Sequence, residues 1–211
     1  YTPTTPGIRQ AVYDELHEME KLKPSAKELK RVQERKKVPK DAEELHTFLM
    51  IEGDVSAQEL GDIYADSGTP GKPDADSTVV SGWLEDLAGR GLAEYIEPGL
   101  WIAAEQNEEY ADAMTGQSDE SGMHIIRRLL YYRGPFPAEQ VQERYLPAET
   151  EYINRWLEML CEQGEIIESE GFYYHAKLYD RARKATIRHL RMEAVTQPPE
   201  HYAALLAGRI R

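Results

Sequence analysis

The sequence predicts a mainly helical protein with small β-hairpins (α+β), built as tandem winged helix-turn-helix domains with flanking helices. Three observations support this prediction: a motif that occurs twice, helical spacing of apolar residues around each copy, and a hairpin pattern after each copy. Gly53 and Gly134 each open a turn followed by a helix that ends at a tyrosine. A Trp-Leu-Glu-x-Leu stretch then leads to Gly91 in one copy and to Gly164 in the other. A repeat of this size indicates two copies of one small fold.

Residues 1–40 are expected to form a basic helical segment. Apolar residues recur at helical spacing over 8–22, and Pro24 ends that helix. Ser25 is the expected N-cap of a second helix over 26–37. The cations of this basic segment have two possible roles: they form a solvated helix face, or they form an arm that contacts phosphates. The DNA-contact candidates here are Lys30, Arg31, Arg35, Lys36 and Lys37.

Residues 41–115 are predicted to form the first, acidic winged helix. Asp41 with Glu44, and Ser56 with Glu59, have the spacing of capping boxes at the starts of two helices. Residues 66–76 are rich in Gly, Pro and Asp and are expected to form a surface loop. A third helix begins at Ser77 or Thr78, and residues 92–96 and 100–103 form a hairpin. The positions of the third helix expected to be buried are Val80, Trp83, Leu84 and Leu87.

Residues 116–176 are predicted to form the second winged helix. Its helices are expected over 123–132, 138–145 and 149–163, and its hairpin over 166–168 and 171–175. The loop before its third helix is eight residues shorter than in the first domain. We expect Trp83 and Trp156 to lie in similar surroundings, each beneath its own hairpin.

Residues 177–211 are predicted to contain a basic helix and the start of a following domain. The helix is expected over 176–192, Pro198 and Pro199 end it, and another helix begins over 200–211. Its DNA-contact candidates are Lys177, Arg181, Arg183, Lys184 and Arg188.

The charge distribution argues against direct DNA reading by either predicted winged helix. The net charge is -13, but residues 41–126 alone carry two Lys/Arg against twenty Asp/Glu. Affinity for nucleic acid depends largely on neutralising phosphates, so this stretch has the wrong sign. The start of the third helix and the hairpin of the second domain are also poor in cations.

The rest of the sequence indicates an intracellular protein without catalytic chemistry. Cys161 is the single cysteine, which favours a reducing cytoplasm, and no apolar stretch approaches the roughly 20 residues of a membrane span. His46 and His124 begin equivalent helices and are expected to be structural. We find no metal-ligand spacing, phosphate loop or nucleophile motif, so we expect no enzyme activity, cofactor or small-molecule ligand in this chain. Because the sequence begins at Tyr1, we expect a piece of a longer protein, although processing also removes an initial methionine.

Several stretches resemble the region that follows the motor in large helicase-related (Lhr) DEAD/DEAH-box helicases. They include residues 41–45, 53–60, 100–105 and 133–139, and the most specific is the basic helix and following segment at 176–195. The resemblance covers about residues 40–211 and implies a non-catalytic part of an ATP-dependent DNA-repair helicase. ATP and Mg²⁺ would then bind in the motor of the parent protein, and the partners would be DNA and other domains of the parent. No Gln-x-Gln motif of the family's glycosylase-like part is present, since Gln197 stands alone.

Two other functions fit the residues. The acidic first domain also suits a protein-interaction module of tandem winged helices, as in ScpB-type partners of chromosome-condensing complexes. A self-contained transcription regulator is the third alternative.

Overall fold

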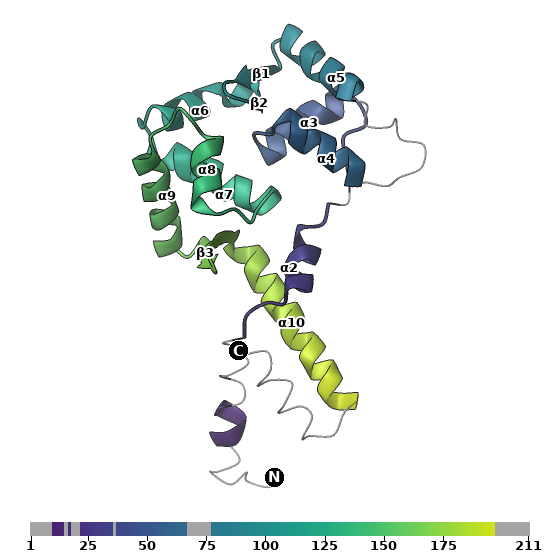
Figure 1. The fold of residues 1–211 in the computed structure, drawn as a ribbon, viewed down its shortest axis with the longest axis vertical. Coiled ribbons are helices and arrows are strands. Elements are labelled where there is room, and N and C mark those ends of the chain that lie inside the picture. The colour runs from purple at the N-terminus through teal and green to yellow at the C-terminus, as the bar shows by residue number, and fades with distance from the viewer. Residues whose placement is uncertain (1–9, 15–16, 18–21, 36, 67–76, 197–211) are drawn as a thin grey trace. The chain divides into compact units, whose positions relative to one another are not determined.

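A computed structural model describes residues 10–14, 17, 22–35, 37–66 and 77–196. The chain divides into two compact units (Figure 1). The central unit is Gln33–Ala176, and the terminal unit comprises the described parts of Tyr1–Val32 and Lys177–Arg211. The expected loop 66–76 lies outside the described residues except for Asp66, and so does the helix expected over 200–211.

The central unit begins with a first repeat, residues 41–103. Its elements are α3 (Ala42–Glu52), α4 (Ala57–Asp66), α5 (Ser77–Gly89), β1 (Ala93–Ile96) and β2 (Leu100–Ala103). The Asp41 carboxylate accepts a hydrogen bond from the Glu44 backbone N–H, which caps α3 as expected. Ser56 and Glu59 form a reciprocal capping box at the start of α4.

A second repeat, residues 118–175, has the same order of elements. They are α7 (Asp119–Tyr132), α8 (Ala138–Arg144), α9 (Thr150–Glu162), β3 (Ile166–Ser169) and β4 (Phe172–His175). Helix α7 begins four residues before the expected Met123, because the Ser118 hydroxyl accepts from the Ser121 backbone N–H and caps it there.

Each repeat ends in an antiparallel hairpin, and each hairpin has one further backbone contact. Strand β1 pairs with β2, and β3 pairs with β4. Val55, in the turn between α3 and α4, forms an isolated bridge with Trp101 of β2. Phe136, at the equivalent position of the second repeat, forms the same bridge with Tyr173 of β4. The two repeats therefore match in these bridges as well as in their order of elements.

A connector joins the two repeats. It consists of a short 3₁₀ turn, η1 (Ala104–Gln106), and helix α6 (Asn107–Met114). Glu105 and Glu108 of the connector are exposed, whereas Tyr110 and Ala113 of α6 are buried. Both belong to the core of the second repeat, together with Leu100 and Ile102 of β2. Apolar packing therefore continues from the first hairpin through α6 into the second repeat.

The third helices of the two repeats bury equivalent apolar positions. Val80, Leu84 and Leu87 of α5 are buried as predicted. At the matching positions of α9, Ile153, Leu157 and Leu160 are also buried. Burial of these side chains supplies much of the apolar stabilisation of each repeat.

The prediction that the two tryptophans share the same surroundings is wrong. Trp156 is 2% exposed, and its indole N–H donates to the Asp119 carboxylate over 2.8 Å. Trp83 was expected to be buried but is only partly so, and it meets Tyr64 edge to face. The indole of Trp156 packs so tightly on α7 that a Cβ added at Gly122 would lie 2.3 Å from it. The first repeat has Asp41, not glycine, at the matching position, so its helix offers no such gap.

The terminal unit contains α2 (Ala26–Gln33) and α10 (Ala176–Thr196). Leu22 and Leu190 form a small apolar cluster with Ile187. The Ser25 backbone N–H donates to the Thr186 hydroxyl over 2.9 Å, which ties the start of α2 to α10. Helix α2 ends at Gln33 and not at the expected residue 37. Two residues further on, Arg35 pairs with Glu52 of α3.

Within the described ranges, no helix combines the length and the apolar character needed to cross a membrane.

Candidate functional site

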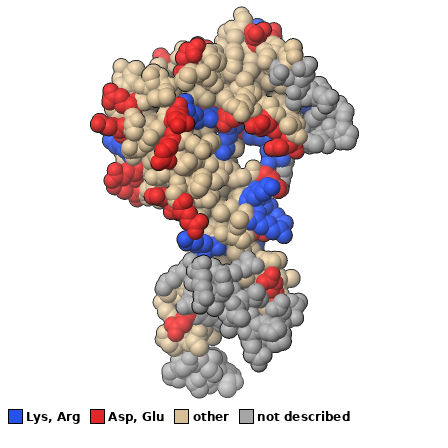
Figure 2. All heavy atoms as spheres, viewed as in Figure 1, with Lys and Arg blue, Asp and Glu red and all other residues tan. Residues whose placement is uncertain are grey.

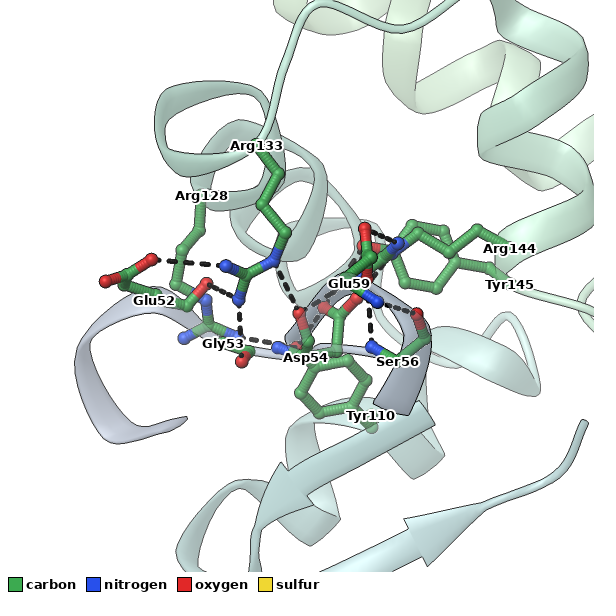
Figure 3. Close-up of polar contacts among 10 residues, drawn as sticks. All are labelled: Glu52, Gly53, Asp54, Ser56, Glu59, Tyr110, Arg128, Arg133, Arg144 and Tyr145. Atoms are coloured by element: carbon green, nitrogen blue, oxygen red, sulfur yellow. Dashed lines mark hydrogen bonds and ion pairs between the residues drawn. The ribbon is translucent and has the colours of Figure 1, made fainter. Parts of the chain in front are cut away.

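The most densely bonded polar cluster of the central unit surrounds Asp54 (Figure 3). We call it the Asp54 network. Its residues come from the first repeat, the connector helix α6 and the second repeat: Glu52, Gly53, Asp54, Ser56, Glu59, Tyr110, Arg128, Arg133, Arg144 and Tyr145.

The backbone turn after α3 places Asp54 in this position. Gly53 ends α3 with φ of +80°, and its N–H donates to the Leu49 carbonyl. This conformation favours glycine. A Cβ at Gly53 would also lie 2.4 Å from the Arg128 side chain, so the glycine lets the second repeat approach closely.

Two consecutive residues at the end of α8 bind the Asp54 carboxylate. Arg144 Nε donates to Asp54 Oδ2 over 2.7 Å, and Arg144 Nη2 donates to the Asp54 backbone carbonyl over 3.0 Å. The Tyr145 hydroxyl lies 3.1 Å from both carboxylate oxygens. The Asp54 side chain is 2% exposed and that of Arg144 is 10% exposed. This is a buried ion pair between the two repeats.

The connector helix supplies the third side-chain donor to Asp54. The Tyr110 hydroxyl donates to Asp54 Oδ1 over 2.5 Å and accepts from the Asp54 backbone N–H over 3.0 Å. Arg128 of α7 donates to the same hydroxyl over 3.0 Å. Tyr110 therefore links all three segments of the central unit through one oxygen atom.

Glu52, the last residue of α3, binds two arginines. Arg133 Nη1 donates to its Oε1 over 3.1 Å, and Arg35 forms a two-bond ion pair with the same carboxylate. Arg133 also donates to the backbone carbonyls of Glu52, Gly53 and Asp54. Both guanidinium groups lie over the Phe48 ring, 5.1 Å from its centroid, within cation–π range.

The pair formed by Glu52 and Arg133 joins equivalent positions of the duplicated motif. Each residue directly precedes the glycine that opens the turn of its repeat. One copy carries an acid and the other a base at this position, so the two turns attract each other.

Glu59 is the third carboxylate of the first repeat in the Asp54 network. Arg144 Nη1 donates to Glu59 Oε2 over 2.9 Å, while Glu59 Oε1 accepts from the Ser56 backbone N–H. The capping box at the start of α4 therefore also contacts the second repeat.

The electrostatics of the network favour ionised carboxylates. Burial works to raise the pKa of Asp54, but Arg144, the Tyr110 hydroxyl and Arg133 outweigh it and hold that pKa below its usual range. Burial likewise opposes ionisation of Glu59, and the hydrogen bond and charge of Arg144 again lower its pKa. Burial and the Asp54 charge raise the pKa of Tyr110 and of Tyr145 well above their ordinary values. The phenols therefore stay protonated and act as donors.

This arrangement connects the repeats and offers little chemistry. Glu52, Asp54 and Glu59 of the first repeat pair with Arg133 and Arg144 of the second. Arg35 also pairs with Glu52, so three guanidinium groups balance the three carboxylates. The Asp54 carboxylate is held by a guanidinium and two phenols, which leaves it unsuited to proton transfer. Removal of one partner from such a buried pair typically costs about 3–5 kcal/mol. The network is suited to fixing how the two repeats are oriented.

The sequence-predicted DNA-contact candidates lie elsewhere, mostly in the terminal unit. Arg181, Lys184 and Arg188 of α10 are exposed, as are Lys177 of α10 and Lys30 of α2. Arg183 is partly buried and donates to Asp180. Lys184 also pairs with Asp180, over 2.9 Å. Besides Arg183, six candidate cations of the two helices therefore lie in the terminal unit: Lys30, Arg31, Lys177, Arg181, Lys184 and Arg188. Of these, Arg31 pairs with Glu28.

The candidates that follow α2 have different settings. Arg35 pairs with Glu52 in the central unit, so its charge is neutralised within the protein. Lys37 is exposed. Lys36 lies outside the described residues.

The arginines of the central unit are committed to internal pairs. All seven have a carboxylate partner: Arg35 with Glu52, Arg90 with Glu43 and Asp86, Arg127 with Glu165, Arg128 with Glu109, Arg133 with Glu52, Arg144 with Asp54 and Glu59, and Arg155 with Asp119. Figure 2 shows acidic side chains scattered over the visible face of this unit and Lys and Arg gathered over α2.

His46 and His124 each pair with a glutamate of the connector, Glu105 and Glu109 respectively. These contacts agree with the structural role expected for both. Within the described residues, no group of three or more His, Cys, Asp or Glu side chains is arranged to hold a metal ion.

Sequence reasoning did not identify the Asp54 network. One signal was available: Arg133 directly precedes the glycine of the second turn and matches Glu52 in the repeat alignment. No protein-family model matches the chain, and a comparison with curated proteins gives no match either.

Proposed function

We propose that each repeat is a winged helix-turn-helix domain, within residues 41–115 and 116–176. Three helices followed by a hairpin, in the same order twice, support this proposal. The bridges of Val55 and Phe136 support it further, because each adds a short third strand position to its hairpin. The flanking segments 1–40 and 177–211 carry the basic helices.

We infer that the chain is a non-catalytic scaffold of a larger, Lhr-like ATP-dependent DNA helicase that acts in DNA repair. The Asp54 network is the observation that carries this inference. A buried, charge-balanced network between two small domains fixes their relative orientation, which is what a scaffold needs. ATP and Mg²⁺ would act in the motor of the parent, and DNA would be bound together with the other domains of the parent.

The coding sequence around residues 1–211 is the first test. A two-lobed ATP motor encoded upstream supports the proposal, and a frame without one contradicts it. In the whole protein, Asp54→Asn should leave DNA-stimulated ATP hydrolysis in place and lower strand separation severalfold, because the scaffold no longer holds its geometry. If Asp54→Asn loosens the contact between the two repeats but leaves strand separation unchanged, the scaffold role is refuted.

A protein-interaction module of the ScpB type is the second candidate. The central unit supports it, with eleven Lys/Arg against thirty Asp/Glu, net -19, and arginines that are all paired. A titration with short single- and double-stranded DNA separates the candidates. Binding tighter than about 10 μM that weakens steeply with salt favours the helicase segment, and absence of binding at low salt favours the interaction module. A transcription regulator would add strong preference for one DNA sequence.

A further inference from the structure

The two compact units carry opposite net charges. The terminal unit has fourteen Lys/Arg against eight Asp/Glu, net +6, whereas the central unit has net -19. A polyanion is therefore attracted to one unit and repelled by the other. At about 0.1 M salt the screening length is about 10 Å, so this difference acts locally.

Helix α10 separates its apolar and cationic residues onto different faces. Leu178, Ala182 and Leu190 recur at multiples of four residues and are buried. Arg181, Lys184, Arg188 and Arg191 recur at intervals of three and four residues and are exposed. Residues at this spacing lie along one face of a helix.

Three of the four cations on this face are available to a ligand. Among the described residues, Arg181, Arg188 and Arg191 have no carboxylate within ion-pair distance. Lys184 pairs with Asp180, but its side chain is 65% exposed. In the central unit, by contrast, a phosphate would have to displace an acid from every arginine.

We propose that this face of α10, Arg181, Lys184, Arg188 and Arg191, binds the phosphodiester backbone of a nucleic acid without reading its bases. The proposal deepens the function inferred above, since it assigns the nucleic-acid contact to one helix face. At 1.5 Å per residue the face is about 15 Å long. Duplex DNA presents about four phosphates per strand over that length, which matches four cations. Arginine suits this role because its planar donors bind phosphate in pairs.

The packing of α10 favours a nucleic acid over an anionic membrane. A helix that binds a bilayer needs a free apolar face to insert between lipids. The apolar face of α10 is already buried, and Thr186 on the same face bonds to Ser25. The exposed large apolar residues of α10, Met192 and Val195, lie at its C-terminal end, so the cationic face has no apolar surface of matching length beside it.

The test is fluorescence anisotropy of a labelled 20-base-pair duplex with the full chain at 20–200 mM salt. Arg181→Gln with Arg188→Gln should weaken binding on the order of tenfold at low salt and lower the slope of log K against log salt by about 1.8. The matched control is Arg90→Gln with Arg155→Gln, two exposed arginines of the central unit with carboxylate partners, which should change neither quantity. Arg181→Lys with Arg188→Lys should keep most of the slope.

Each contrary result has a distinct meaning. Equal losses in the Gln pair and the control pair would overturn the assignment to α10. Binding to phosphatidylserine vesicles without binding to the duplex would overturn the choice of partner. Absence of duplex binding by the unaltered chain at 20 mM salt would overturn this proposal, while the scaffold role is judged separately by strand separation in the whole protein. Far-ultraviolet circular dichroism checks that every variant is folded.

Discussion

Substitution of Asp54 by asparagine tests whether the buried network holds the repeats together. Asparagine keeps the size of the side chain but removes its charge. Arg144, whose side chain is 10% exposed, would then lose the buried carboxylate that its Nε binds and keep only Glu59 as a charged partner. Loss of one partner of a buried ion pair costs about 3–5 kcal/mol, and we expect a value in this range.

The free energy of unfolding can be measured in urea by tryptophan fluorescence. All three tryptophans lie in the central unit, so the signal reports on that unit alone. For a protein of this size the expected loss corresponds to a decrease in Tm of about 6–20 °C. Asp86→Asn is the matched control, because Asp86 pairs with Arg90 while 56% exposed, and its loss should cost less than about 1 kcal/mol.

A loss below about 1 kcal/mol for Asp54→Asn would refute the reasoning, because the network would then contribute no more than a surface pair. A double-mutant cycle with Arg144→Met separates the pair from its surroundings. We expect a coupling energy of about 1.5 kcal/mol or more.

Three further predictions concern the same unit. The pKa of Asp54 in the folded state lies below its unfolded value of about 3.9, so the stabilisation from its ionised form is complete above that value and is lost as the pH falls through the folded pKa. The unaltered protein should therefore lose stability in acid more steeply than Asp54→Asn does. If urea unfolding at pH 2.5–6 gave the same dependence of stability on pH for both proteins, the prediction would be wrong. Tyr145→Phe removes one donor to the Asp54 carboxylate and should lower the unfolding free energy by about 1.5–3 kcal/mol in urea, and an unchanged midpoint would be evidence against that bond. Gly122→Ala places a methyl group against the Trp156 indole, which should cost about 1–3 kcal/mol of stability and lower Tm. Gly82→Ala, which has open space around it in α5, should raise Tm. Equal shifts of Tm in the two variants would count against the packing described.

The elements within each repeat were predictable because their signals are local. The capping pairs of Asp41 with Glu44 and of Ser56 with Glu59 mark helix starts through backbone hydrogen bonds within one turn. The hairpins around Pro98 and Gly171 follow from strand patterns on either side of a turn. Such interactions need no knowledge of the rest of the molecule.

The contacts between the repeats were not predictable in this way. Asp54 follows a turn glycine and looks like an ordinary surface turn residue, because periodicity does not tell which surfaces of two domains meet. Its partners Tyr110 and Arg144 lie 56 and 90 residues further along the chain. The repeat alignment correctly identified apolar positions but failed for Trp83, because the gap that accepts Trp156 depends on Gly122 in another helix.

The most direct measurement is the distance between spin labels placed on the two repeats. Glu85→Cys in α5 and Glu158→Cys in α9 provide exposed labelling sites, in a background in which Cys161 is replaced by alanine. Pulsed electron paramagnetic resonance should give one narrow distance distribution for the otherwise unaltered chain and a broad one after Asp54→Asn. A broad distribution in both proteins, or a narrow one in both, would contradict the claim that the Asp54 network fixes the two repeats as one body.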